Sequence, residues 1–118
     1  MKAVRVVAHW LEDENDKIIF DVVLDEENKV KDSHIFGYYI DDEEKYPFLC
    51  VENKLHLGPW FEFEDASEAD ELISPIQFPI LGREIKLGTE LTRVDPLKGG
   101  TEEYTYEVKE IIDQTKTS

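Results

Sequence analysis

Residues 102–112 read EEYTYEVKEII and form the clearest pattern in the chain. The even positions hold Tyr104, Tyr106, Val108 and Ile112, with mostly polar residues between them. A period of two is typical of a β-strand that has one buried face and one face in water. We therefore expect a strand here, with Tyr104, Tyr106 and Val108 facing the core.

A second run with the same alternation precedes this strand and places Ile85, Leu87 and Leu91 on one face. The two runs are separated by residues 95–100, which read DPLKGG. Proline fixes one φ angle and glycine permits positive φ, as a hairpin loop requires. The pattern predicts a long antiparallel hairpin from about residue 84 to residue 112, with the rest of the chain packed on its apolar face.

The first half of the chain also alternates and is rich in β-branched residues, which favours further strands. The expected strands cover residues 2–11, 17–25, 33–40, 46–52, 54–57 and 60–64. Gly37 interrupts one of them, and a glycine inside a strand indicates a bulge, a bend or the close approach of another backbone. Val7, Ile19 and Val23 are apolar on the second face of their strands, so those strands are covered on both sides or contribute to an interface.

One short helix is predicted at about residues 66–73, where Asp65 can act as the N-cap, Glu68 completes a capping-box-like pair and Pro75 prevents continuation. The fold class is therefore mostly β. We expect a small antiparallel, partly open barrel or a bent two-sheet sandwich with that one helix. The alternative is an α+β arrangement with a bent sheet over the helix.

The length of 118 residues predicts one globular domain, residues 1–112, followed by a frayed tail at 113–118. The chain has 28 Asp and Glu against 13 Lys and Arg, which gives a net charge of −15. Such a chain repels polyanions, so we expect neither nucleic acid nor a membrane as a partner. Basic proteins, basic peptides or divalent cations are better partners, although solubility alone explains the charge equally well.

The residues that usually carry chemistry are few and scattered. Cys50 is the only cysteine and lies in an apolar strand, which predicts an inert core thiol and a reducing, cytoplasmic location. His9, His34 and His56 lack metal-ligand spacing. The acidic loop that begins at Asp13 resembles a calcium loop only at its start. We therefore predict no catalytic residue, no metal and no cofactor.

Acidic residues form three clusters, at 12–16, 41–44 and 62–71. The third cluster adjoins Trp60, and carboxylates around an aromatic anchor suit the recognition of a Lys/Arg-rich surface. The predicted partner-binding residues are Trp60, Glu62, Glu64, Asp65, Glu68, Asp70 and Glu71. The competing interpretation is a solvated acidic face with Trp60 in the core.

These observations favour an acidic non-enzymatic binding protein that occludes a basic protein partner. In a bacterium, that protein would be of the immunity, inhibitor or anti-defence type. One alternative is a small-ligand-binding or catalytic β-barrel with Tyr38, Tyr39, Trp60 and a histidine around a pocket. Another is a homo-oligomeric structural component that uses the two-sided apolar strands, so the choice between monomer and homodimer stays open.

Overall fold

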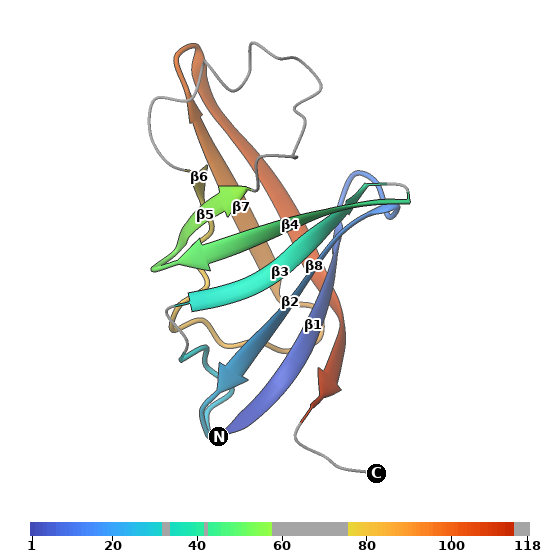
Figure 1. Ribbon diagram of the computed structural model, residues 1–118, viewed down its shortest axis with the longest axis vertical. Coiled ribbons are helices and arrows are strands. Elements are labelled where there is room, and N and C mark those ends of the chain that lie inside the picture. The colour runs from blue at the N-terminus through green and yellow to red at the C-terminus, as the bar shows by residue number, and fades with distance from the viewer. Residues whose placement is uncertain (32–33, 42, 58–75, 115–118) are drawn as a thin grey trace.

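The computed structural model describes residues 1–31, 34–41, 43–57 and 76–114, and this part of the chain forms a closed antiparallel barrel (Figure 1). The strands are β1 (Lys2–Trp10), β2 (Asp16–Leu24), β3 (His34–Asp41), β4 (Glu44–Val51), β5 (Lys54–Leu57), β6 (Ile76–Gln77), β7 (Glu90–Leu97) and β8 (Gly100–Asp113). Each strand pairs with the next in sequence, and β8 pairs with β1 to close the barrel. The expectation of a small antiparallel barrel is confirmed, and the strand order is closed rather than partly open.

The described residues contain strands, turns and loops but no helix. The predicted helix at 66–73 and the predicted strand at 60–64 lie outside the described residues. Within them, no helix has the length and apolar character that crossing a membrane requires.

The alternation predicted for the first hairpin is confirmed. Even-numbered residues of β1 and β2 face the barrel interior, and their neighbours face outward. The inward residues are Val4, Val6, Ala8, Ile18, Phe20, Val22 and Leu24, all at most 2% exposed. Burial of these side chains is the main favourable contribution to folding on this side of the barrel.

Gly37 lies in the middle of β3, opposite Phe20 of β2 and Phe48 of β4. A Cβ atom at this position would lie 2.3 Å from the backbone oxygen of Ile19 and 2.7 Å from Cζ of Phe48. The predicted close approach of another backbone is therefore confirmed. Glycine allows β3 to pass this point without displacing its neighbours.

One end of the barrel, where the chain turns after β2, β4 and β6, is closed by apolar side chains, and we call it the closed end. Val30, Phe78, Ile80 and Ile85 are each at most 2% exposed there. The Asn53 side-chain oxygen accepts hydrogen bonds from the backbone N–H groups of Ile80 and the following residue, at 3.1 and 2.8 Å. Asn53 itself has a φ of 69°, a left-handed value that asparagine tolerates well in a two-residue hairpin turn.

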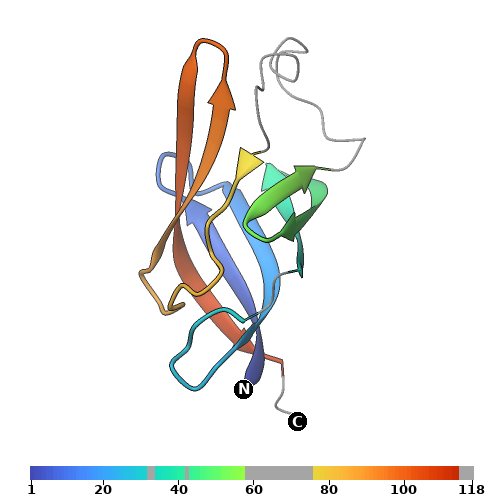
Figure 2. The ribbon, with the colours of Figure 1, turned by 90° about the vertical axis from the view of Figure 1, so that its left-hand side faces the viewer.

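The hairpin expected between residues 84 and 112 is present but shorter at its start. β7 begins at Glu90, and residues 98–99 form the turn, so residues 95–97 belong to the strand and not to the loop. Leu87 was expected to share a buried face with Ile85 but is 66% exposed. It lies in a turn with Gly88 at a φ of +89°, and that turn ends the alternation that the sequence suggested. Figure 2 shows the β7–β8 hairpin extending beyond the other turns at its end of the barrel.

The end of β8 departs from strict alternation because its register against β1 shifts. Val108 pairs with Ala8, whereas Glu110 pairs with Val7, so β8 carries one extra residue at this point. Such a β-bulge reverses which side chains face inward. As a result Ile111 packs against the core, and Ile112, which the pattern placed on the apolar face, is 44% exposed.

Candidate functional site at the mouth of the barrel

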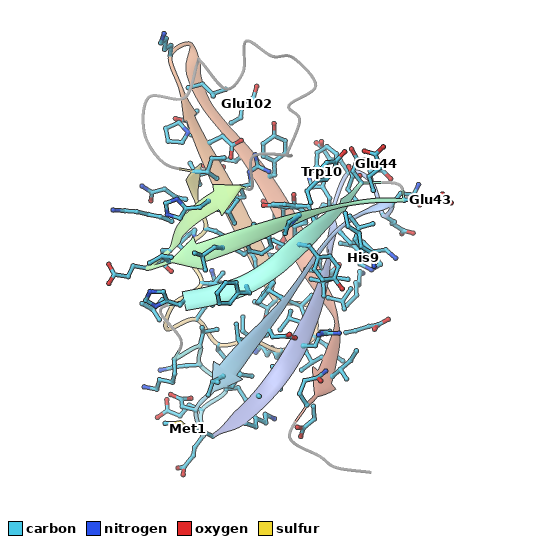
Figure 3. The ribbon with its side chains drawn as sticks, in the orientation of Figure 1. Met1, His9, Trp10, Glu43, Glu44 and Glu102 are labelled. Atoms are coloured by element: carbon cyan, nitrogen blue, oxygen red, sulfur yellow. The ribbon has the colours of Figure 1, made fainter. Side chains whose placement is uncertain are left out.

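The seven predicted partner-binding residues lie between positions 58 and 75, outside the described residues. Trp60, Glu62, Glu64, Asp65, Glu68, Asp70 and Glu71 therefore remain predictions. The two other acidic clusters can be placed except for Asp42, which lies outside the described residues. Both lie at the end of the barrel where the chain turns after β1, β3 and β7, which we call the mouth (Figure 3).

The interior of the barrel changes from apolar to polar near the mouth. Leu91, Arg93 and Asp95 face inward from β7, and the two charged residues are only 8% and 5% exposed. Arg93 donates from Nε to Oδ1 of Asp95 at 2.7 Å and from Nη2 to Oδ2 at 2.6 Å. This fork-to-fork geometry is the strongest form of an arginine–carboxylate pair.

Aromatic rings enclose the arginine. Its Cζ lies 5.3 Å from the ring centroid of Tyr39 and 5.1 Å from that of Tyr104, within cation–π range of both. The ring of Tyr104 also contacts Trp10 at 5.8 Å, and the ring of Tyr39 contacts Tyr106 at 6.1 Å. The inner mouth is thus a layer of one ion pair and four aromatic rings.

The ionisation of this layer limits its chemistry. Burial lowers the pKa of the Arg93 guanidinium, but Tyr39 and Asp95 outweigh burial and hold that pKa above its usual range. Burial raises the pKa of Tyr39, Tyr104 and Tyr106, so their phenols stay protonated at neutral pH. Arg93 is neutralised by Asp95, and the tyrosines are poor bases and poor nucleophiles. The layer can therefore fix the shape of the mouth, but it contains no activated catalytic group.

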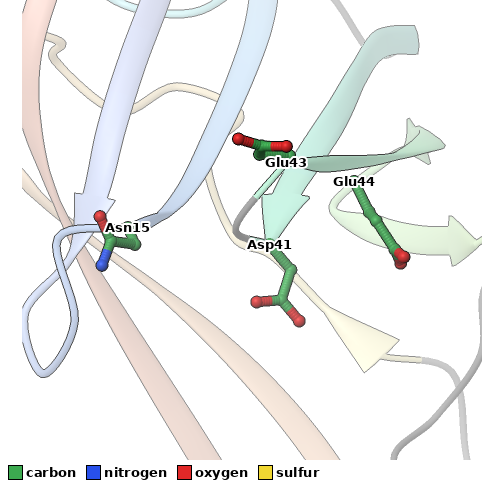
Figure 4. Close-up of a pocket in the computed structure, with 4 residues that line it drawn as sticks. All are labelled: Asn15, Asp41, Glu43 and Glu44. Atoms are coloured by element: carbon green, nitrogen blue, oxygen red, sulfur yellow. The ribbon is translucent and has the colours of Figure 1, made fainter.

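The rim of the mouth is acidic. Asp16 at the start of β2 pairs with Asp41 at the end of β3, which brings the acidic turn at 12–16 beside the acidic turn at 41–44. We define the acidic rim as Glu12, Asp13, Glu14, Asp41, Glu43 and Glu44, which are all exposed. Figure 4 shows the hollow between the two turns, lined by Asn15, Asp41, Glu43 and Glu44.

Tyrosine hydroxyls hold two carboxylates near the mouth. Tyr46 donates to Oε2 of Glu44, and Tyr104 donates to Oε2 of Glu102 at 2.6 Å. The ion pairs found among the described residues do not include Asp41, Glu43 or Glu44. The negative charge of this part of the rim is therefore not neutralised by a lysine or arginine in the described structure.

The histidines and the cysteine are not part of the inward-facing mouth layer; His9 precedes Trp10 on β1 and is half-buried. His34 and His56 are exposed on β3 and β5, and the described residues contain no group of three or more His, Cys, Asp or Glu that could hold a metal ion. Cys50 faces the interior, where burial raises the pKa of its thiol to about 11. This placement agrees with the predicted inert core cysteine.

The pocket suggested from the sequence required Tyr38 and Tyr39 to line one cavity. Tyr39 is buried in the core, whereas Tyr38 is on the opposite face of β3, where Lys45 lies 5.4 Å from its ring centroid. Adjacent residues of a strand face opposite sides of the sheet, so this pair cannot line one interior pocket.

The Arg93–Asp95 pair escapes sequence reasoning because Asp95-Pro96 is typical of the start of a loop. The available signal was the spacing of Leu91, Arg93 and Asp95, which continues the period of two. A charged residue on the inward face of a strand is normally taken as evidence against a strand.

Comparison with known proteins gives no family for this chain: no family model, curated protein or solved structure matches it. The case for a function therefore rests on the geometry of the mouth and on the distribution of charge.

Proposed function

We propose that this protein is an acidic, non-enzymatic binding protein that covers a basic surface of another protein. The observation that supports this proposal most strongly is the pairing of Asp16 with Asp41, which joins two acidic turns into one rim. Carboxylates on one rim produce a local negative potential that attracts lysine and arginine side chains and accelerates association.

The aromatic residues behind the rim support the same function. Trp10, Tyr46 and Tyr104 are half-buried and pack against the core, so they are rigid and partly accessible. Rigid aromatic residues contribute most of the binding energy in many interfaces, and charged residues around them determine which partner is accepted. A partner that inserts a lysine or arginine into the rim would gain both kinds of contact.

The wider biological role is part of this proposal. An acidic protein that occludes the basic cleft of a nucleic-acid enzyme would act, in a bacterial cell, as an immunity, inhibitor or anti-defence protein. A cytoplasmic location is also proposed, since the only cysteine, Cys50, is a buried free thiol. The predicted cluster around Trp60 would extend the binding surface beyond the rim.

The small-ligand barrel is not favoured by the described interior. Phe20 and Phe78 pack edge to face with a centroid distance of 6.0 Å, and Tyr39 packs on Phe48 at 5.4 Å. These rings fill part of the interior in which a ligand would have to lie, which supports a binding protein over a ligand-carrying barrel.

The proposal is tested by titrating the protein with a ten-residue Lys/Arg-rich peptide and a Gly/Ser peptide of equal length by calorimetry. The rim variant carries Asp41→Asn, Glu43→Gln and Glu44→Gln. We expect it to lose roughly tenfold or more of its affinity for the basic peptide, because charges near the contact dominate the attraction. The Gly/Ser peptide should not bind.

The matched control removes three carboxylates from the closed end through Glu26→Gln, Glu27→Gln and Glu84→Gln. This control should change the affinity by less than about threefold, since screened charges far from the contact contribute little. Equal losses in the two variants would mean that only net charge matters and would overturn the assignment of the rim. A third variant, with Glu68→Gln, Asp70→Gln and Glu71→Gln, measures how much the predicted cluster around Trp60 adds.

A further inference from the structure

The outer face of β1–β5 is apolar at its centre, although it lies on the outside of the barrel. Val7, Ile19, Tyr38 and Pro47 stand next to one another in a continuous row across β1, β2, β3 and β4. Phe36 and Leu49 form the adjoining pair on β3 and β4. We call these six residues the outer apolar patch. The five strands that carry the patch and its surroundings form the near side of the barrel in Figure 1.

The patch is accessible at its centre. Phe36 is 70% exposed, Pro47 is exposed, and Tyr38 and Leu49 are half-buried. A single exposed apolar side chain is common on a protein surface, but a contiguous group that includes a phenylalanine and a tyrosine is typical of an interaction site.

The charges around the patch differ from those of the rest of the chain. Its charged outward-facing neighbours on β1–β5 are Arg5, Lys17, Lys45 and Lys54 and one carboxylate, Asp21, while on β8 the exposed Glu110 stands next to Val7. Asp21 accepts a hydrogen bond from Arg5 Nε at 2.9 Å, so its charge is already paired. This face is thus slightly positive in a chain whose net charge is −15.

We propose that the outer apolar patch is the contact surface for a second copy of this chain. Two molecules of charge −15 repel one another, and contact between acidic surfaces would also require carboxylates to lose water. Pairing through this face lowers both costs, because it desolvates mainly apolar side chains and because Asp21, the carboxylate beside them on β2, is already paired with Arg5.

The size of the face sets the expected strength of the contact. Five strands about 4.8 Å apart span roughly 20 Å, and about seven residues along each strand span a similar length. The outer apolar patch covers only part of this face, so the interface is small and the dimer is weak and reversible. In a two-fold contact every interaction occurs twice, so one substitution in the chain removes two contacts from the dimer.

The test is sedimentation equilibrium of the full chain from about 10 μM to 1 mM, at low salt and at ~0.3 M salt. We expect a monomer–dimer equilibrium that shifts toward dimer at the higher salt, because salt screens the repulsion between the two acidic bodies. The proposed binding of a basic partner has the opposite salt dependence. A failure of one proposal is therefore distinguishable from a failure of the other.

Two variants, Phe36→Asp and Phe36→Lys, should both weaken the dimer at least tenfold, since each places a charge in the apolar contact. The matched control is Leu87→Asp, which changes an equally exposed leucine in the turn between β6 and β7. It should dimerise like the unmodified chain. Circular dichroism and the melting temperature establish that all three variants are folded.

Three results would overturn the proposal. The first is a monomer at all concentrations and both salt levels. The second is a dimer that survives both substitutions of Phe36 but is lost in the rim variant, which would indicate a head-to-tail contact. The third is binding of a deca-glutamate peptide or a ten-residue oligothymidylate that requires Phe36 and occurs without self-association, which would identify an acidic partner in place of a second copy.

Discussion

At the closed end of the barrel the inward side chains are Phe78, Ile80 and Ile85, whereas at the mouth they include Arg93, Asp95 and Tyr104. Both layers line the same barrel, but the apolar side chains come from the segment between β6 and β7, whereas the polar ones come from β7 and β8. The apolar layer is stabilised by the removal of its surface from water. In the charged layer, the attraction between Arg93 and Asp95 must first offset the free energy that their desolvation costs. Apolar residues of similar size would therefore stabilise the barrel equally well.

The surface charges of the two ends differ in the same way. Near the closed end, Lys29 pairs with Glu27 at 3.2 Å and Lys86 pairs with Glu84 at 3.6 Å. Near the mouth, Asp41, Glu43 and Glu44 take part in none of the ion pairs that the described residues show. Some of the charge at the closed end is therefore paired, whereas these carboxylates at the mouth have no ion-pair partner in the part of the chain that the structure describes. This difference supports placing the binding surface at the mouth.

The largest effect is expected from breaking the ion pair inside the mouth. Arg93→Met leaves the Asp95 carboxylate buried without a cation, and should reduce the free energy of unfolding by about 3–5 kcal/mol. The double variant Arg93→Met with Asp95→Leu removes both charges and should recover most of that loss. Urea denaturation of the three proteins measures both quantities. A double variant as unstable as the single one would mean that the pair itself stabilises the barrel.

A smaller effect is expected in β8, where one residue faces the interior and its neighbour faces water. Val108→Ala should cost about 1–3 kcal/mol, because it removes two buried methyl groups. Glu107→Ala should be close to neutral, since the Glu107 carboxylate forms a partly exposed ion pair with Lys109 at 2.8 Å. Similar losses at both positions would contradict the inward orientation of Val108.

Much of this barrel is predictable from alternation alone, as β8 shows. Tyr106 and Val108 are buried and Tyr104 packs on the core, as their even positions indicate. Alternation fails where a local event changes the register. The extra residue in β8 turns Ile112 outward, and the turn that contains Gly88 exposes Leu87. The extra residue in β8 has no signal in a single sequence, because it depends on the register with β1, whereas Gly88 was a turn signal that the alternation outweighed.

The candidate site was less predictable than the fold for a related reason. The two acidic turns at 12–16 and 41–44 are visible in the sequence, but their adjacency follows from the pairing of β2 with β3. The Arg93–Asp95 pair was hidden because a proline follows it and because charged residues are seldom placed in a core.

At alkaline pH the buried ionisable groups should respond differently from the solvated ones. The folded-state pKa of Cys50 is raised by burial from 9.0 to about 11. Above pH 9 the unfolded chain loses the Cys50 proton while the folded chain still keeps it, which favours the unfolded state. The free energy of unfolding is therefore unaffected by this group below pH 9 and falls as the pH rises toward 11. The raised pKa values of Tyr39, Tyr104 and Tyr106 act in the same direction above pH 10.

The free energy of unfolding should therefore fall between pH 9 and pH 11 when it is measured by urea denaturation. Cys50→Ala is the control, since it lacks the thiol and should show a shallower fall between pH 9 and pH 10. A free energy that is constant over this range would show that the buried groups titrate as freely as exposed ones.

The smallest effect concerns the surface charges of the two ends. At −15 the folded chain repels itself, so the melting temperature should rise as the salt concentration increases from low values to ~0.5 M. The rim variant with Asp41→Asn, Glu43→Gln and Glu44→Gln should already be more stable at low salt, by a few tenths of a kcal/mol, and should respond less to added salt.

The closed-end variant with Glu26→Gln, Glu27→Gln and Glu84→Gln removes the same number of charges, but Glu27 and Glu84 are paired with lysines, so its melting temperature should rise little or fall slightly. Differential scanning calorimetry at three salt concentrations separates the cases. A melting temperature that falls steadily with salt in the unmodified chain would mean that attractive ion pairs outweigh self-repulsion. An equal gain in both variants would mean that the excess charge is spread over the whole surface and is not concentrated at the mouth.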